Sequence, residues 1–501
     1  MKNARRDFLK SIGLFSVGLG LSPFSGYATP TLARKELHSP LRTPVRIRGR
    51  VVAKGKGLPG VAVTDGLRVV TTSSGGAYEL ISDSTREYVY ISLPSGYEIP
   101  TAPNGIANFY HRIRPSAKAE FSANFDLKPT ALNDINHAFL VLADPQIQNR
   151  YEADQLLTVT APDVKALVQS YQDKPVFGLG CGDLVFDEFP LFKDYQEAVS
   201  RMGIPFYQVL GNHDMDIDSR SDDLSTRTFA SLFGPTYYSF NRGQVHYIVL
   251  DDVFSIGGKK YIGYLTEPQL KWLEQDLALV EKGSTVVVSL HIPAYTGASK
   301  RNKGSSELGG TVSNRPELYR LLEPFKAHIM SGHTHFNENV FEGSAYEHVH
   351  GTVCGAWWSG PICNDGTPNG YGVYEVNGSQ LSWKYKSTGK PLTHQSRLYR
   401  PGTDPASPSD LIVNVWNHDP AWKVMWYQDG IRQGEMRQQQ GLDPLSVELH
   451  TGPEKPQRRT WVEPGITDHL FRAQPAALAK QITVEITDRF GKVYTESVNL
   501  S

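Results

Sequence analysis

The sequence contains the stretch Phe206-Tyr207-Gln208-Val209-Leu210-Gly211-Asn212-His213-Asp214, in which a short apolar run ends at a glycine and three polar residues. A short apolar run of this kind predicts a buried β-strand. In open α/β sheets, functional sites form just beyond the carboxyl ends of the strands. The same residues also suit a simple polar turn, so their meaning depends on which residues come after the other predicted strands.

Four more polar motifs follow predicted strands in the same part of the chain. They are Asp144-Pro145-Gln146, Gly182-Asp183-Leu184-Val185-Phe186-Asp187, His291 and Gly332-His333-Thr334-His335. Taken alone, an Asp after a strand is more often a helix cap than a ligand, and a single His is usually a core residue. Together, the motifs offer carboxylate, amide and imidazole groups, which are ligands for divalent cations.

The strands before these motifs alternate with amphipathic segments. We predict strands at residues 138–143, 176–180, 206–210, 245–250, 285–290 and 328–330, and helices at 154–170, 192–202 and 267–281. This alternation indicates an α/β fold.

In this order, the five motifs resemble those of the calcineurin-like metallophosphoesterases, D-x-[HQ], GD-x(3)-D, GNH[DE], H and GH-x-H. The resemblance implies an α/β core of two facing mixed β-sheets flanked by helices, placed at residues 133–390. Short β-like runs at 43–130 predict an antiparallel sandwich that is similar to the carboxypeptidase-regulatory-like module. After a linker at 391–408, similar runs predict a second all-β domain at 409–501, so an all-β sandwich domain is expected at each end.

The family pattern, carried onto the matching positions, implies a site for two divalent metal ions. One ion would be held by Asp144, Gln146, Asp183 and His335, and the other by Asp183, Asn212, His291 and His333. Two such ions about 3.5–4 Å apart bind both the attacking and the leaving oxygen of a phosphoester. The resemblance therefore implies in-line attack by a hydroxide that bridges the ions.

Gln146 departs from the commonest family pattern, which has histidine at this position. An amide oxygen is a harder donor than an imidazole, so the first site should favour Mn or Mg over Zn, while Fe also suits the ligand set. Glutamine here is similar to the manganese-dependent ADP-ribose/CDP-alcohol diphosphatase branch. This adds nucleotide-type diphosphates to phosphomonoesters and phosphodiesters as candidate substrates.

Three residues beside the ligands are expected to support the reaction. His213 should face the substrate, where it can stabilise charge or protonate the leaving oxygen. Asp214 is placed to orient the His213 ring, or to cap a helix after the turn. Asp187 is expected to hold a ligand or a loop in place rather than to bind an ion.

Candidate substrate contacts lie on both sides of the last motif. Arg301 belongs to a basic loop at residues 300–306 that could cover a phosphate, although a solvated surface loop is the simpler interpretation. Trp357 and Trp358 could stack on a nucleobase or a sugar, and in an extended segment they would face opposite sides. Tyr371 lies in the segment that comes after them.

Composition restricts the partners. The 51 basic and 52 acidic residues are nearly balanced, which argues against binding to nucleic acid or to an anionic membrane through overall positive charge. A phosphorylated small molecule or glycan is the expected substrate. Three cysteines cannot form a disulfide framework, but a Cys354–Cys363 bond remains open.

The N-terminus has the pattern of an export signal, placed at residues 1–33. Arg5-Arg6-Asp7-Phe8-Leu9-Lys10 precedes an apolar run at residues 12–21 and small residues near Ala28. The run is too short to span a bilayer, and no later segment reaches that length. The paired arginines resemble a twin-arginine leader, although ordinary Sec export stays open. A periplasmic or extracellular location is expected.

Two other functions fit parts of the sequence. A binding protein that keeps the fold without catalysis would be expected to lose ligands, whereas all the motifs are complete here. A protein serine/threonine phosphatase is disfavoured because the Arg of the calcineurin phosphatases' second motif is absent, Asp187 being followed by Glu188.

Overall fold

The structure is a computed structural model that describes residues 43–302, 307–453, 455–456 and 458–500. The predicted export signal lies outside the described residues. None of the described helices combines the length and apolar character needed to cross a membrane.

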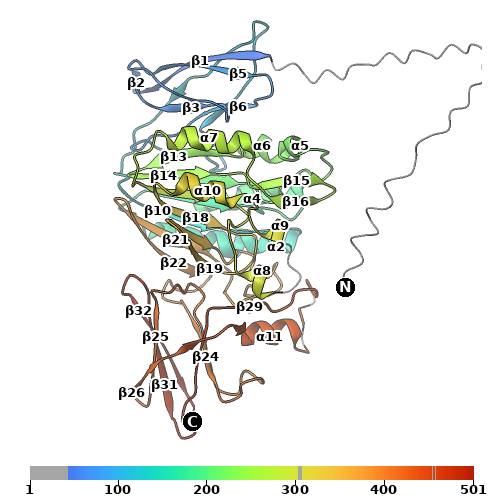
Figure 1. Cartoon of the computed structure of the whole chain (residues 1–501), viewed down its shortest axis with the longest axis vertical. Helices are drawn as coiled ribbons and strands as arrows, with labels where there is room; N and C mark the ends of the chain where they lie inside the picture. The colour runs from blue at the N-terminus through green and yellow to red at the C-terminus, as the bar shows by residue number, and fades with distance from the viewer. Residues whose placement is uncertain (1–42, 303–306, 454, 457, 501) are drawn as a thin grey trace, which may run out of the picture. The chain divides into compact units, whose positions relative to one another are not determined.

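The central part of the described chain contains two mixed β-sheets (Figure 1). The first has the order β12 (Phe206–Val209), β11 (Val176–Cys181), β10 (Asn136–Leu142), β21 (Gly370–Asn377) and β22 (Gln380–Ser387). The second has the order β13 (Tyr238–Arg242), β14 (Val245–Val249), β17 (Thr285–Ser289), β18 (Lys326–Ser331), β20 (Ala345–Val349) and β19 (Glu338–Glu342). Strands β10, β11 and β12 run parallel, as do β14, β17, β18 and β20.

Alternate residues of each strand enter different cores, as the two-residue period of a strand requires. In β10, Phe139 and Val141 pack with residues of the second sheet, whereas Leu140 and Leu142 pack with helices. Because both faces are covered, these strands are apolar throughout, which explains why they read as continuous apolar runs in the sequence. The expected core of two facing sheets flanked by helices is therefore present.

Two pairs of helices cover the outer faces of the sheets. Residues of α3 (Ala161–Gln169) and α4 (Phe192–Met202) share a core with the first sheet, and residues of α7 (Glu267–Leu277) and α10 (Arg315–Leu322) share one with the second. The predicted helix at 154–170 is in fact α2 (Arg150–Gln155), a π-helical turn at Leu156–Thr160, and α3. Pro162 lies at the start of α3, and its missing N–H explains the break in the regular helical hydrogen bonds.

The segment before the central sheets forms two smaller sheets. β1 (Pro44–Ala53) pairs antiparallel with β2 (Lys56–Gly57) and β5 (Ala77–Asp83), but parallel with β8 (Glu120–Ser122) and β9 (Phe125–Asp126). The other sheet has the order β4 (Val69–Thr71), β3 (Ala62–Thr64), β6 (Tyr88–Ile91) and β7 (Tyr110–Arg112). The prediction of a wholly antiparallel sandwich is therefore wrong at β8 and β9.

The C-terminal segment also forms two four-stranded sheets. One contains β23 (Arg397–Tyr399), β24 (Leu411–Asn414), β30 (Leu470–Ala473) and β27 (Arg437–Gln438), and the other β26 (Ile431–Glu435), β25 (Lys423–Gln428), β31 (Gln481–Thr487) and β32 (Val493–Asn499). β23 lies inside the predicted linker, where its pairing with β24 was not foreseen. The segment is not all-β, because α11 (Pro444–Thr451) begins at the Asp443 cap.

Smaller strand pairs complete the fold. A hairpin of β15 (Val253–Gly257) and β16 (Lys260–Gly263) precedes α7, and β28 (Gly441–Leu442) pairs with β29 (Ile466–Thr467). Four short helices of the described chain lie in the loops that connect the larger elements: α5 (Asp222–Ser225), α6 (Arg227–Phe233), α8 (Ala298–Arg301) and α9 (Glu307–Gly310).

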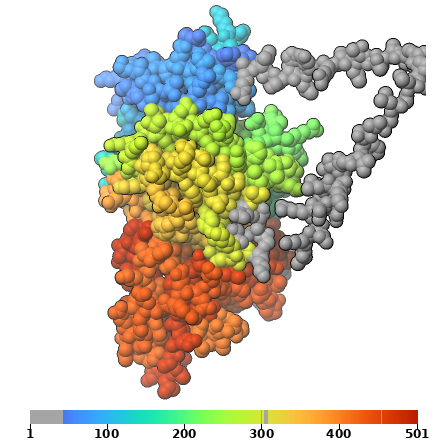
Figure 2. All heavy atoms as spheres, viewed as in Figure 1, coloured from blue at the N-terminus to red at the C-terminus, as the bar shows by residue number. Residues whose placement is uncertain are grey.

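Two asparagine side chains join the C-terminal segment to the central part. Asn337 donates to the carbonyl of Trp416 at 2.6 Å, and Asn339 donates to the carbonyls of Asn417 and His418. Figure 2 shows the atoms of the C-terminal segment lying directly against those of the central part. Residues from the C-terminal segment can therefore reach the edge of the central sheets.

Candidate metal centre

The five polar motifs lie at the carboxyl ends of five parallel strands from both central sheets. Asp144, Asp183 and Asn212 follow β10, β11 and β12, while His291 and His333 follow β17 and β18. Parallel neighbours end at the same edge of a sheet, and the two sheets face one another. This topology brings the motifs together although they are far apart in sequence.

One group of ligand atoms is already gathered at metal-binding distances. The side chains of Asp183, His291 and His333 each place an atom within 4.8 Å of the other two. His291 Nε2 lies 3.2 Å from Asp183 Oδ1, 3.2 Å from His333 Nδ1 and 3.1 Å from Asn212 Oδ1. These are the four residues predicted for the second ion.

The residues predicted for the first ion lie on the other side of Asp183. Gln146 Nε2 donates to Asp183 Oδ2 at 2.5 Å, and His335 Nε2 lies 3.7 Å from Asp144 Oδ1. Asp183 therefore contacts members of both sets, through a different carboxylate oxygen for each. This is the geometry expected of a bridging carboxylate.

The three imidazoles share one pattern of hydrogen bonds. The nitrogen that points away from the cluster contacts a backbone carbonyl in each case: His291 Nδ1 that of Cys181 at 3.1 Å, His333 Nε2 that of Gly309 at 3.0 Å, and His335 Nδ1 that of Gly355 at 2.6 Å. A backbone carbonyl can only accept a hydrogen bond, so the contacting ring nitrogen carries the N–H and the other nitrogen keeps a free lone pair. Metal-binding histidines are typically oriented in this way.

Several buried polar atoms of the cluster have no hydrogen-bond partner among the described residues. They are Asp144 Oδ1, Gln146 Oε1 and His335 Nε2. Buried polar atoms are almost always paired, so each orphan needs an explanation such as an ion. All three belong to the residues predicted for the first ion, and the donor set therefore fits a divalent cation.

Burial and charge set the proton affinities in the cluster. Burial raises the pKa of Asp144 to about 8, and it lowers the pKa of His333 to about 3 and that of His335 to about 4. For Asp183, burial alone would raise the pKa, but the charges of His291 and His213 outweigh it and hold the pKa below its ordinary value. The Asp183 carboxylate is thus ionised, and the His333 and His335 imidazoles are neutral, which are the forms of these groups that bind metal.

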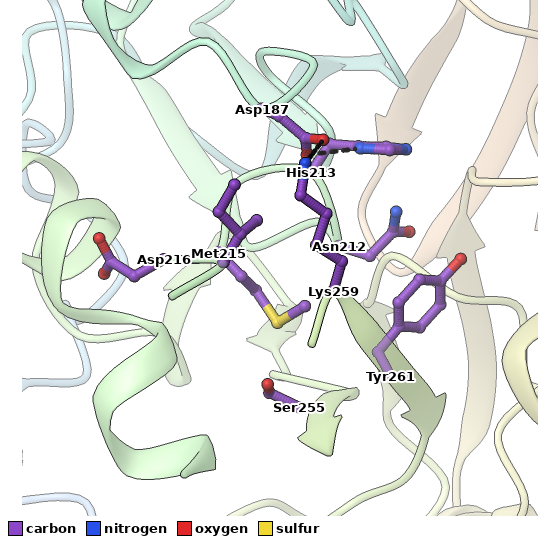
Figure 3. A pocket seen from close by; sticks show the side chains of 9 residues that line it. Asp187, Asn212, His213, Met215, Asp216, Ser255, Lys259 and Tyr261 are labelled. Carbon is purple, nitrogen blue, oxygen red and sulfur yellow. Dashed lines mark hydrogen bonds and ion pairs between the residues drawn. The ribbon is translucent and has the colours of Figure 1, made fainter. Parts of the chain in front are cut away.

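His213 lies beside the cluster on the wall of a small cavity (Figure 3). Its Nδ1 contacts Asp187 Oδ1 at 2.9 Å, and its ring stacks on Phe186 with centroids 4.0 Å apart. Burial would lower the pKa of His213, but Asp183 and Asp187 raise it above its ordinary value. The cavity measures about 130 Å³, and its other lining residues include Lys259 and Tyr261 from the β15–β16 hairpin.

The prediction that Asp214 orients the His213 ring is wrong. Both carboxylate oxygens of Asp214 accept from backbone N–H groups of Leu184, Val185 and Gly211, so this residue ties two motif loops together. No helix begins at Asp214 either. The side chain that contacts the His213 ring is that of Asp187, so this residue holds the candidate acid rather than a ligand or a loop as expected.

The backbone around the cluster is unusually strained. Of the thirteen described non-glycine residues with positive φ, six lie in the motifs: Asp144, Gln146, Asp183, Asp187, His333 and His335. Four more belong to segments that surround them, namely Lys259, Trp357, Trp358 and Arg459. Such conformations cost free energy and tend to gather at functional sites.

Two motif glycines are required by close approach. A Cβ at Gly211 would lie 1.9 Å from the backbone nitrogen of Asp183, and one at Gly332 would lie 2.4 Å from Asp144 Oδ2. No side chain fits at such distances. The glycines therefore let neighbouring loops pack tightly enough for their ligands to converge.

The candidate substrate contacts are placed differently from one another. Trp357 stacks on the His335 ring with centroids 4.0 Å apart. Trp358 is buried, and its Nε1 donates a hydrogen bond to the carbonyl of Pro145, which holds the first motif in place. Both residues have positive φ and are therefore not extended, so the expectation that they face opposite sides of an extended segment does not apply.

Arg301 and Tyr371 do not fit the contact role. Arg301 is paired with Glu338 and with Asp468 from the C-terminal segment, so its charge is already engaged. Tyr371 is fully buried and donates to Asp163 on α3. Neither side chain is available to a substrate in this structure.

The disulfide bond left open for Cys354 and Cys363 is not formed, because both residues are free thiols.

Sequence reasoning missed four residues at the edge of the cluster. Lys259 and Tyr261 lie on a hairpin that shows no motif, and Arg459 and Trp461 come from the C-terminal segment. Their approach depends on how distant segments pack. Nothing in the local sequence signals that packing.

The fold and the cluster define an α/β protein with a candidate site for divalent metal at the edges of two facing sheets. Residues 137–337 match the family model described as calcineurin-like phosphoesterase. Residues 45–130 and 347–494 match the models for the N terminal and the C terminal of calcineurin-like phosphoesterase. The chain belongs to the calcineurin-like phosphoesterase family.

Similar proteins include phosphatases. Purple acid phosphatase 15 of Arabidopsis thaliana is 28% identical over 188 residues, which cover 33% of this chain and 33% of that relative. The chain therefore spans about a third of the length of that relative. Among solved structures, purple acid phosphatase PPD1 from yellow lupin (Lupinus luteus) covers 69% of this chain and 67% of its own, with 14% identity and a TM-score of 0.38. A 5'-nucleotidase from Candida albicans covers 52% of each chain, with 12% identity and a TM-score of 0.31.

Proposed function

We propose that this protein is a phosphoester hydrolase that works with two divalent metal ions. The observation that carries the proposal is the set of unpartnered buried atoms on Asp144, Gln146 and His335, which adjoin the gathered group of Asp183, His291 and His333. Family membership supports the reaction class, and so does the name of the Arabidopsis relative.

Each ion would have its own set of ligands. Asp144, Gln146, Asp183 and His335 would hold one, and Asp183, Asn212, His291 and His333 the other. When bound, the ions supply Lewis acidity and lower the pKa of water. Oxygen and nitrogen donors suit Mn, Fe, Zn or Mg, and the Gln146 amide favours Mn or Mg.

The chain itself would supply the proton and the orientation. His213 is held against Phe186 and Asp187 at the wall of the cavity, so its Nε2 is the atom that can donate a proton to the leaving oxygen. Asp187 favours the protonated ring, because its carboxylate contacts Nδ1. General acid catalysis of this kind contributes about 10²–10⁴ in rate.

The substrate would be a phosphomonoester, a phosphodiester or a nucleotide-type diphosphate carried by a small molecule or glycan. The relative that is named a phosphatase favours the monoester, whereas glutamine at position 146 favours the diphosphate. We also propose export to the periplasm or the exterior, on the basis of the paired arginines and the apolar run in the N-terminal sequence.

The test is turnover by protein that has been stripped of metal and reloaded with Mn, Fe, Zn or Mg. The substrates are p-nitrophenyl phosphate, bis-p-nitrophenyl phosphate and a panel of nucleotide diphosphates, and the variants are Asp183→Asn and His213→Ala. We expect metal-dependent turnover that collapses in both variants. If wild type and Asp183→Asn are indistinguishable with every metal and substrate, the proposal is wrong and a binding role should replace it.

A further inference from the structure

A short segment of the C-terminal part reaches two aromatic–imidazole stacks of the metal centre. The Arg459 guanidinium lies 5.6 Å from the centroid of Phe186, the ring that stacks on His213. The Trp461 ring lies 4.7 Å from that of Trp357. Trp357 in turn stacks on His335. The segment therefore touches the immediate surroundings of both proposed metal sites.

The segment is held in this place by specific bonds. Arg459 donates to Gln148 Oε1 at 2.7 Å and to Glu152 Oε1 at 2.8 Å, and the Glu152 side chain is buried. Arg458 lies over the ring of Tyr151, 4.1 Å from its centroid. Arg459 keeps a positive φ of 57°, a conformation that persists only where its surroundings enforce it. These contacts fix where Trp461 lies.

Trp461 is nevertheless 55% exposed. A large aromatic side chain that is held in place and partly exposed offers a flat apolar face on which another ring can stack. The plane of the Trp461 ring is tilted by 58° from that of the Trp357 ring, so the two rings are not stacked on one another. Of the two, Trp357 is the ring that contacts the proposed ligand His335.

We propose that Trp357 and Trp461 bind the flat face of a ring in the leaving group of the substrate. Trp461 of the C-terminal segment would thereby help to select the phosphoester, while the residues at the edge of the central sheets cleave it. A nucleobase and the C–H face of a sugar both present such a face, and tryptophan stacks on either. This inference rests on the proposed function and names the kind of substrate that the same site takes.

The test compares Trp461→Ala with wild type on three phosphomonoesters: AMP, glucose 6-phosphate and glycerol 3-phosphate. Loss of one stacking partner should raise KM for a ring-bearing substrate by about tenfold. The value of kcat should change little, because the ring of Trp461 contacts Trp357, which is neither a proposed ligand nor the candidate acid. For glycerol 3-phosphate, which has no ring, kcat/KM should stay within about twofold of wild type, and Trp461→Phe should recover most of the loss.

Ile431→Ala is the matched control, because Ile431 is also an exposed apolar residue of the C-terminal segment and lies on β26. This variant should leave KM and kcat unchanged for all three substrates. Trp357 is unsuitable for substitution because it stacks on His335. A loss confined to AMP identifies a nucleobase, and one confined to glucose 6-phosphate identifies a sugar. Equal losses on all three substrates, or no loss on any, overturn the inference.

Failure of the proposed function would look different, because wild type would then hydrolyse none of the substrates with any metal. A measurement that does not need turnover decides the inference in that case. Calorimetric titration of AMP and of glucose 6-phosphate into metal-free protein should show weaker binding to Trp461→Ala than to wild type for at least one ligand. Identical binding to the two proteins for both ligands rules out the ring site.

Discussion

The contact between His213 and Asp187 gives the first prediction at the scale of single residues. Because the carboxylate holds the ring and favours its protonated form, His213→Gln should lower kcat by about 10²–10⁴. Asp187→Asn should lower it by about tenfold, through loss of orientation. Steady-state kinetics should be accompanied by metal analysis, since the bound metal should be unchanged in both variants. A variant that loses metal would instead place the side chain among the ligands.

A second residue-scale prediction concerns the choice of metal. The Gln146 amide oxygen has no partner among the described residues and lies in the set proposed for the first ion. Replacing it by an imidazole in Gln146→His should shift the preference from Mn or Mg toward Zn. Competition between Mn and Zn, followed by metal analysis of the dialysed protein, measures the shift. An unchanged Mn-to-Zn ratio would show that Gln146 does not bind metal.

Much of the site at this scale is foreseeable from sequence. The seven proposed ligands follow strands with recognisable apolar runs, so strand order brings them to one region. The role of Asp214 was mistaken because its neighbour in sequence is His213, whereas its bonds go to the backbone of the Asp183 loop. Side-chain direction after a turn is set by packing, which the local pattern does not reveal.

Among the elements, the loop between β18 and β19 offers a third prediction. A methyl group at position 332 would lie 2.4 Å from Asp144 Oδ2 and 2.9 Å from the Cβ of Ala143. Gly332→Ala should therefore separate the first and last motifs and greatly weaken metal binding. Isothermal titration with Mn would measure the loss. Gly360→Ala is the control, because the nearest atom to its new methyl group lies at 3.6 Å, and normal affinity in Gly332→Ala would contradict the argument.

The strands with continuous apolar runs and the amphipathic helix α4 were the easiest elements to predict. Helix α4 lies at residues 192–202, as its amphipathic pattern indicated, and the five motif strands are within two residues of their expected bounds at each end. The shorter pieces could not be predicted. β23 and the parallel strands β8 and β9 have two or three residues each, so they exist because of long-range pairing.

For the whole molecule, buried histidines predict a dependence of stability on pH. Burial lowers the pKa of His137 to about 4, while the unfolded chain should titrate near its ordinary value of 6.5. The contribution of neutral His137 is therefore fully present above about pH 6.5 and is lost as the pH falls toward 4. The loss should be about 1.4 kcal/mol per pH unit.

Urea unfolding of wild type and His137→Asn, in chelator and at pH 7, 6 and 5, isolates this effect. The difference in free energy of unfolding between the two proteins should shrink as the pH falls, because only wild type carries the histidine. Other titrating groups act on both proteins and cancel. A difference that stays constant over this range would contradict the assignment.

Export is the other prediction for the whole molecule. If Arg5 and Arg6 form a twin-arginine signal, replacing both by lysine should leave the protein in the cytoplasm. Cell fractionation followed by immunoblotting measures this in a bacterial host, with a twin-arginine transporter deletion beside it. Export that survives both the lysine pair and the deletion would point to the Sec route.

The strained backbone of the metal centre has a consequence for the lifetime of the protein. Positive φ at six motif residues, at about 1–2 kcal/mol each, makes this edge of the fold a store of unfavourable free energy that bound ions would offset. Without ions, the motif loops should open more readily than the sheets that carry them, and proteases cut such openings first. The supply of metal would then determine how long each molecule resists proteolysis as well as how fast it turns over substrate.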